Sequence, residues 1–227
     1  MLLIPIGTAE RPRRQPLATF SLILFTIAAY LASRWSGLPQ DQVLDRWGFI
    51  ANECSPATFL TSMFLHRHLW LLIVNMWLLF VFGPLIESRL SHLPFGLLYV
   101  AGGLASAAVA AGLDQGSDRM LANVGSSGAL GAILGAFVVL YPFTDIRIWY
   151  VWFLTYWGFK MGIVRVMGLL VIVLWFLGQL FALWLESLSG KRSVDMLLPF
   201  GGFLFGVIAS VVGFGKEGVR RETSYED

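Results

Sequence analysis

Long apolar runs separated by short polar connections repeat along the whole chain. Most of these runs reach about 20 residues, the length that an α-helix needs to cross the roughly 30 Å apolar core of a bilayer. The pattern therefore predicts a bundle of six membrane-spanning helices. The predicted spans are residues 17–35, 68–86, 94–113, 123–142, 167–185 and 194–214.

Two connections are longer and of mixed character. Residues 36–65 combine turn-forming with apolar residues, and residues 143–166 are aromatic and also carry charged side chains. We expect the first to be an amphipathic connection at the membrane interface and the second to be an interfacial aromatic belt. One alternative stays open, because the uncharged middle of the second connection, residues 148–159, could partly enter the membrane.

Composition agrees with a membrane protein. Hydrophobic residues make up 57% of the chain, the mean hydropathy is +0.72 and charged residues are 13%, against about 25% in soluble domains. The net charge is only +2 and the basic residues are scattered, which excludes a nucleic-acid-binding surface. The single Cys54 cannot form an internal disulfide. We predict an all-α polytopic membrane protein with tails at residues 1–16 and 215–227 and one membrane domain at residues 17–214.

The distribution of Lys and Arg between the two sides of the predicted helices gives the orientation. With six spans both tails share one side, which carries most of the 16 basic residues and is expected to be cytoplasmic. The second, fourth and sixth spans then begin on the outer side. Asn75, Ser127 and Pro199 would lie at similar depth near those beginnings and could line one shallow, outward-facing site. The short tails and the absence of a targeting segment fit the inner membrane of a bacterium.

The fourth predicted span begins with hydroxyl groups among glycines. In the segment Gly125-Ser126-Ser127-Gly128, the candidate reactive group is Ser127. An alternative stays open, since a serine between glycines in a membrane helix also permits close packing and can hydrogen-bond a neighbouring backbone. Small residues in and near the fourth and sixth spans are expected to let helices approach closely. They are Gly125, Gly128, Gly131, Gly135, Gly201, Gly202 and Gly206.

Several segments, taken in order, resemble the rhomboid family of intramembrane serine proteases, and the resemblance covers most of the chain. They are PATFLTSMFLH (56–66), NM (75–76), FGPLIE (82–87), GSSGA (125–129) and GGFLFG (201–206). The resemblance implies a six-helix bundle with a lateral opening that admits single-span transmembrane proteins from the membrane lipid, and it implies no cofactor. It also places Ser127 at the nucleophile position and Asn75 at the oxyanion-stabilising position.

The chain departs from this family at the catalytic base. The resemblance implies a histidine two residues before the paired glycines of the sixth span, where this chain has Pro199, and an oxyanion histidine four residues before Asn75, where it has Leu71. A serine hydroxyl is a poor nucleophile unless a base takes its proton, and losing one oxyanion donor costs about 10²–10³ in kcat. We therefore expect a diverged member, a pseudoprotease that binds transmembrane partners without cleaving them.

The alternative is an active intramembrane serine endopeptidase in which a rearranged base serves Ser127. His66 resembles a structural group that braces the outer loop, His68 faces a different side of its helix, and His92 falls on the cytoplasmic side. Asp195 lies one helical turn before the position of the missing histidine, and it could act as a base if burial raised its pKa.

The sequence permits two further interpretations. Asn75 could equally form a structural hydrogen bond to a neighbouring helix, since a polar side chain facing lipid is costly. A solute transporter is the least favoured function, because no charged residue is placed with confidence inside a span and no pair of interrupted helices is visible.

Overall fold

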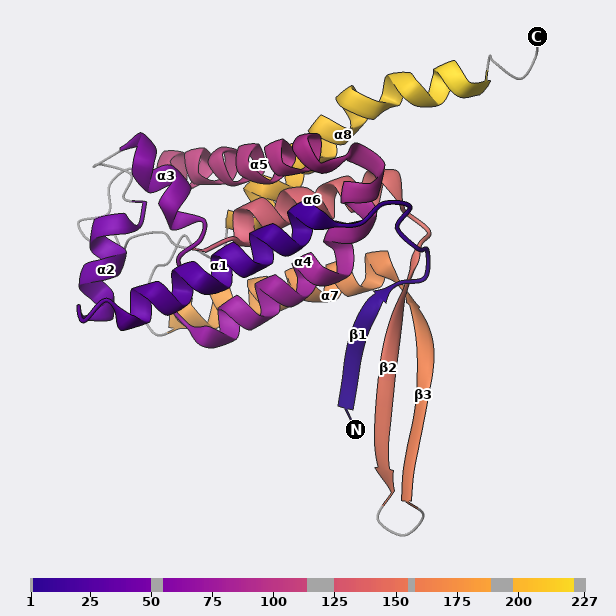
Figure 1. Cartoon of the computed structure of the whole chain (residues 1–227), viewed down its shortest axis with the longest axis horizontal. Coiled ribbons are helices and arrows are strands. Elements are labelled where there is room, and N and C mark those ends of the chain that lie inside the picture. Colours follow the sequence, from indigo (N-terminus) through magenta and orange to yellow (C-terminus); the bar gives the residue numbers. More distant parts are fainter. Residues whose placement is uncertain (1, 50–54, 114–124, 155–157, 189–197, 223–227) are drawn as a thin grey trace.

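The structure is a computed structural model of the whole chain, of which residues 2–49, 55–113, 125–154, 158–188 and 198–222 are described. The protein is mostly helical, and a three-stranded sheet projects from one end of a helix bundle (Figure 1). The helices are α1 (Leu17–Trp35), α2 (Gln40–Trp47), α3 (Pro56–Ser62), α4 (Leu69–Leu90), α5 (His92–Leu113), α6 (Ser127–Leu140), α7 (Gly168–Leu188) and α8 (Leu198–Glu222). The strands are β1 (Leu2–Thr8), β2 (Asp145–Leu154) and β3 (Gly158–Met167).

A helix is present at each of the six predicted spans, but the helices differ in length. Within the described residues, four helices, α1, α4, α5 and α7, are long and apolar enough to cross a membrane. The apolar stretches of α6, Ser127–Leu140, and of α8, Leu198–Gly213, are shorter. Length and composition therefore support four crossings, and the six-span count remains a prediction.

Helix α6 lies at the centre of the bundle. Every residue from Ser127 to Phe137 is buried, and the Phe137 ring meets that of Phe82 on α4 edge to face, with ring centroids 4.8 Å apart. An α-helix of this length extends only about 20 Å. Because protein surrounds α6 on its sides, its length does not have to match the thickness of the lipid.

Helices α6 and α8 approach each other until their backbones touch. A Cβ added to Gly202 would lie 1.7 Å from the carbonyl oxygen of Gly128, and one added to Gly135 would lie 2.2 Å from that of Phe203. Gly131 and Gly206 are equally confined, by Pro199 and Ala132. Glycine is the residue that permits such contact between membrane helices.

The expectation of an all-α fold is wrong for the N-terminal segment and for the connection between α6 and α7. β1 lies within the predicted tail, and β2 and β3 form an antiparallel hairpin; the sheet order is β1-β2-β3, with both pairings antiparallel. The physical reason is that seven of the ten residues of β2 are β-branched or aromatic, the composition that packs well in a pleated sheet. Within the range 148–159, the described residues 148–154 and 158–159 therefore belong to the sheet and take part in its backbone hydrogen bonding.

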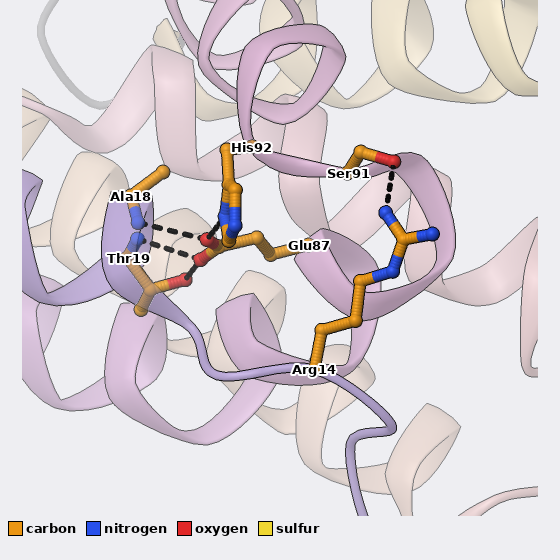
Figure 2. A network of polar contacts seen from close by, with 6 residues as sticks. All are labelled: Arg14, Ala18, Thr19, Glu87, Ser91 and His92. Atoms are coloured by element: carbon orange, nitrogen blue, oxygen red, sulfur yellow. Dashed lines mark hydrogen bonds and ion pairs between the residues drawn. The ribbon is translucent and has the colours of Figure 1, made fainter.

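The beginning of α1 is capped by a side chain from another helix. Its N-cap residue, Pro16, provides no side-chain cap. Instead the buried carboxylate of Glu87, near the end of α4, accepts hydrogen bonds from the backbone N–H groups of Ala18 and Thr19, at 2.8 and 2.7 Å. Figure 2 shows that the Thr19 hydroxyl and His92 Nδ1 also point at this carboxylate. A negative charge at a helix N-terminus is stabilising, so this network fixes α1, α4 and α5 together.

A second contact ties the N-terminal segment to the same end of the bundle. Arg14 donates to the Ser91 hydroxyl at 2.7 Å, beside the Glu87 network (Figure 2). The backbone N–H of Arg13 donates to the hydroxyl of Ser88 at 2.6 Å. The sheet and these basic residues therefore share one end of the molecule, which is the end opposite to the start of α6.

Candidate functional site

A tight turn places the two serines at the start of α6. Gly125 has a φ of +128°, which favours glycine, and its N–H donates to the carbonyl oxygen of Ser62 at 2.8 Å. Ser126 is the N-cap residue of α6, yet its hydroxyl makes no capping hydrogen bond to the helix. A serine at this position usually accepts from the first-turn amides. Here the Ser126 hydroxyl is available for another partner.

That partner is His66, in the connection between α3 and α4. His66 Nε2 lies 3.2 Å from Ser126 Oγ and also 3.2 Å from Asn75 Nδ2 on α4. The three side chains are 0%, 1% and 0% exposed, in the order His66, Ser126 and Asn75. An amide nitrogen can only donate, so with the amide in this orientation Nε2 is the acceptor and the proton of the neutral ring resides on Nδ1. The cluster thus joins the connection between α3 and α4 to α4 and α6.

Burial keeps this imidazole neutral. It lowers the pKa of His66 from 6.5 to about 4, and the nearby backbone of Phe64 offsets only part of this effect. At neutral pH His66 is therefore uncharged and can accept hydrogen bonds. Its affinity for a proton is roughly 300-fold below that of an ordinary histidine, which makes it a weak general base.

Ser127, the predicted nucleophile, has a different environment from its neighbour. It is the first residue of α6 and is 6% exposed. Among the described residues, none forms a hydrogen bond with Ser127 Oγ. The imidazole in this part of the bundle thus contacts the hydroxyl next to the one that the sequence singled out.

The two positions at which the resemblance implies histidines hold apolar side chains inside the protein. Leu71 is half-buried and lies one turn before Asn75 on α4. Pro199 is buried as the second residue of α8, and its carbonyl oxygen packs against Gly131 of α6. Proline is tolerated here because the N–H of the second helical position has no partner within the helix. Neither side chain can transfer a proton.

Neither of the other two histidines forms a hydrogen bond with Ser127. His68 is exposed as the N-cap residue of α4, and His92 contacts Glu87 at the opposite end of that helix. Asp195 lies outside the described residues. In the described ranges, no group of three or more His, Cys, Asp or Glu residues could hold a metal ion.

A small cavity lies beside the turn that carries the serines. About 20 Å³ is available there to the centre of a water-sized sphere, between residues that include Ser62, Ser106, Gly125 and Leu198. This is room for a single water molecule. The Ser106 hydroxyl donates to the carbonyl oxygen of Leu198, which fixes the start of α8 against α5.

Ser126 is the residue that sequence reasoning missed. It is adjacent to Ser127 in the motif, but the two side chains point in directions about 100° apart around the helix axis. The available signal in the sequence was a serine at an expected N-cap position, together with a histidine just before the second predicted span. Only the fold brings these residues together, since they are 60 positions apart.

Comparison with known proteins identifies the family. The model of the Rhomboid domain matches residues 53–216. A search of curated proteins finds no match. The matched segment includes α3 to α7, the apolar part of α8 and every residue of the His66 cluster. Because the match covers well over half of the chain and its helices are apolar enough to span a membrane, the protein is an integral membrane protein of the rhomboid family.

Proposed function

We propose that this protein is a rhomboid pseudoprotease, which binds single-span transmembrane proteins without cleaving them. One observation carries the proposal. No described residue hydrogen-bonds to Ser127 Oγ, and the lone pair of His66 Nε2 is already shared by Ser126 and Asn75. A hydroxyl without a base remains protonated and is a poor nucleophile.

The missing groups account for most of the rate enhancement that such a site can supply. Removing the histidine base of a serine protease costs about 10⁶ in kcat, and one lost oxyanion donor costs about 10²–10³. The two losses do not add, because the groups act as a unit. The absence of a histidine base at position 199 is therefore sufficient by itself to abolish useful cleavage.

The packing of α7 supports the binding of a partner helix. Only 17% of its apolar stretch Gly168–Leu185 is buried, against 56% for the stretch of α4. It contacts α8 through aromatic rings. The centroid of the Phe176 ring lies 4.7 Å from that of the Phe200 ring and 5.0 Å from that of the Phe203 ring. A helix held by so few contacts can move aside at low cost. This agrees with the lateral entry that the family resemblance implies.

We also propose six crossings, with both termini in the cytoplasm and the inner membrane of a bacterium as the location. The two shorter helices, α6 and α8, would cross inside the bundle, where surrounding protein replaces lipid. Arg13 and Arg14 lie at the end of the bundle that would face the cytoplasm. The His66 cluster lies near the opposite, outward-facing end.

A labelling and cleavage experiment tests the proposal. The purified protein is reconstituted in liposomes with a panel of single-span transmembrane substrates and, separately, with a serine-reactive fluorophosphonate probe. Ser127→Ala and Ser126→Ala serve as matched controls. We expect no cleavage, and no labelling that depends on either serine. Labelling that disappears in Ser127→Ala would refute the proposal.

One observation favours the alternative, an active protease with a rearranged base. His66 Nε2 lies 3.2 Å from a serine hydroxyl, although that hydroxyl belongs to Ser126. If the base served Ser127 after a change of rotamer, cleavage would require both His66 and Ser127. If labelling were lost in Ser126→Ala and in His66→Gln but not in Ser127→Ala, the nucleophile would be Ser126.

A further inference from the structure

The three-stranded sheet is the largest feature that the proposed function does not use. β2 begins five residues after Leu140, the last residue of α6, and β3 leads into α7 without a linker. Figure 1 shows the strands running across the direction of the main helices. A strand of ten residues extends about 33 Å. If the helices cross the membrane, the strands therefore run roughly parallel to its surface, and β1 lies against α4, where the Trp77 indole donates to the carbonyl oxygen of Pro5 at 3.0 Å.

The pairing of β2 with β3 places alternate residues on opposite faces. The inner sheet face includes Ile146 and Ile148, which pair with Val166 and Val164. Ile146 is fully buried in the core of the bundle, and Ile148 packs against the same core. We call the opposite side the outer sheet face. Its described residues are Asp145, Arg147, Trp149, Met161, Ile163, Arg165 and Met167.

The outer sheet face carries large apolar side chains of β3 that are uncovered. Met161, Ile163 and Met167 are 61%, 58% and 46% exposed. Large exposed apolar side chains that follow one another along a strand mark a binding or membrane surface. β3 lacks the usual alternation of apolar and polar residues, because its residues on the inner sheet face are apolar as well.

Two arginines occupy the root of this face beside Asp145, and neither forms an ion pair with that carboxylate. Arg147 and Arg165 are direct cross-strand partners. Neither has an ion-pair partner in the part of the chain that the structure describes, and the Nε of Arg147 is buried without a hydrogen-bond partner among the same residues. Like charges directly opposite each other on a sheet are destabilising. An anion shared by the two guanidinium groups would remove this repulsion.

We propose that the outer sheet face binds the headgroup layer of the membrane that the bundle spans. Arg147 and Arg165 would share the phosphate of an anionic lipid, since guanidinium groups bind phosphate with two hydrogen bonds. Met161, Ile163 and Trp149 would enter the boundary between headgroups and acyl chains, where aromatic and apolar anchors are stable. The continuity of β3 with α7 favours lipid over a soluble protein, because it fixes the sheet beside the bilayer.

Fluorescence quenching tests the placement of this face. In a Cys54→Ser background, a single cysteine at Ile163 is labelled with an environment-sensitive dye, and the protein is reconstituted in vesicles of phosphatidylcholine and phosphatidylglycerol. Cysteines at Leu177 on α7 and Gln42 on α2, both exposed, serve as lipid-facing and water-facing references. We expect nitroxide-labelled lipid to quench the dye at Ile163 about as strongly as at Leu177, and aqueous iodide to quench it little.

The same assay tests the two arginines. Quenching at Ile163 by nitroxide-labelled phosphatidylglycerol should exceed quenching by nitroxide-labelled phosphatidylcholine. The preference should fall about fivefold for each arginine replaced, in Arg147→Gln and Arg165→Gln. Arg46→Gln, on α2, is the matched control and should leave it unchanged.

Two outcomes would overturn the proposal. Iodide quenching equal to that at Gln42 would show that the face is in water. Protection from both quenchers would show that protein, such as a second copy of this chain, covers it. A lipid signal that is the same for both lipids would remove the role of the arginines in headgroup binding.

Discussion

Replacing Gly202 by alanine should push α6 and α8 apart and destabilise the bundle. The added Cβ would lie 1.7 Å from the carbonyl oxygen of Gly128 and 2.7 Å from its carbon. A Cβ atom essentially never lies closer than 3.0 Å to a heavy atom of another part of the chain, so the two helices would have to separate by more than 1 Å. No rotamer change can relieve the contact, because its other side is backbone.

The position of the contact determines how much folding stability the substitution costs. Overpacking of a well-packed interior costs about 1–3 kcal/mol, occasionally more. We expect the upper end, about 3 kcal/mol, because α6 is buried along most of its length and cannot shift freely. For a chain of 227 residues, a change of 1 kcal/mol moves the Tm by about 2–4 °C. The Tm of Gly202→Ala should therefore fall by about 6–12 °C.

Thermal unfolding in detergent, followed by the fluorescence of the nine tryptophans, measures this shift. The matched control is Gly178→Ala on α7, where an added Cβ meets nothing within 4 Å. Alanine is the better helix former by about 1 kcal/mol, so this variant should be as stable as the parent or slightly more so. Equal Tm values for the two variants would refute the close contact between α6 and α8.

Three other predictions concern the site. Ser126→Ala should cost about 1 kcal/mol of stability because a buried hydrogen bond to His66 is lost, whereas Ser127→Ala, which removes no hydrogen bond among the described residues, should leave the Tm nearly unchanged; the opposite order would contradict the assignment. The pKa of His66 is lower in the folded protein, about 4, than its ordinary value of 6.5, so the unfolded chain takes up a proton first as the pH falls. The stability difference between the parent and His66→Gln should thus be largest above pH 6.5 and shrink toward pH 4, by about 3 kcal/mol in total; a difference that is constant between pH 4 and 7 would show that His66 is not buried neutral. Pro199→His combined with Leu71→His should restore some fluorophosphonate labelling, and this labelling should vanish when Ser127→Ala is added; labelling that persists in that background would place the reaction elsewhere.

The helices could be predicted from the sequence because each apolar run is local. A segment such as residues 17–35 carries its own evidence, since one helix needs only its own apolar length and its end signals. The family resemblance, confirmed by the match to residues 53–216, added the order of the motifs.

The sheet could not be predicted in the same way. Its two faces are both largely apolar, so the alternation that identifies a strand is hidden, and Arg147 and Arg165 resemble the scattered charges of an interfacial loop. β1 pairs with β2 across about 140 residues of sequence, as in the register of Thr8 with Ile146. A pairing between such distant segments leaves no local pattern.

The contact of His66 with Ser126 was hidden for a related reason. It depends on which hydroxyl the first turn of α6 directs toward the loop, and this is set by the glycine turn at Gly125. Sequence spacing identifies the turn and both serines. It does not give the rotation of the helix about its axis relative to a loop that lies 60 residues earlier.

The cluster also explains why Asn75 need not indicate catalysis. A buried amide without a partner costs about 1–3 kcal/mol, and here Asn75 satisfies part of its hydrogen-bonding capacity with His66, which in turn contacts Ser126. Selection for stability alone would therefore maintain Asn75, His66 and Ser126 in a pseudoprotease of the kind proposed above. The same argument does not protect Ser127, which has no hydrogen bond to a described residue. Substitution of Ser127, rather than of Asn75, is consequently the test that distinguishes an active protease from an inactive one.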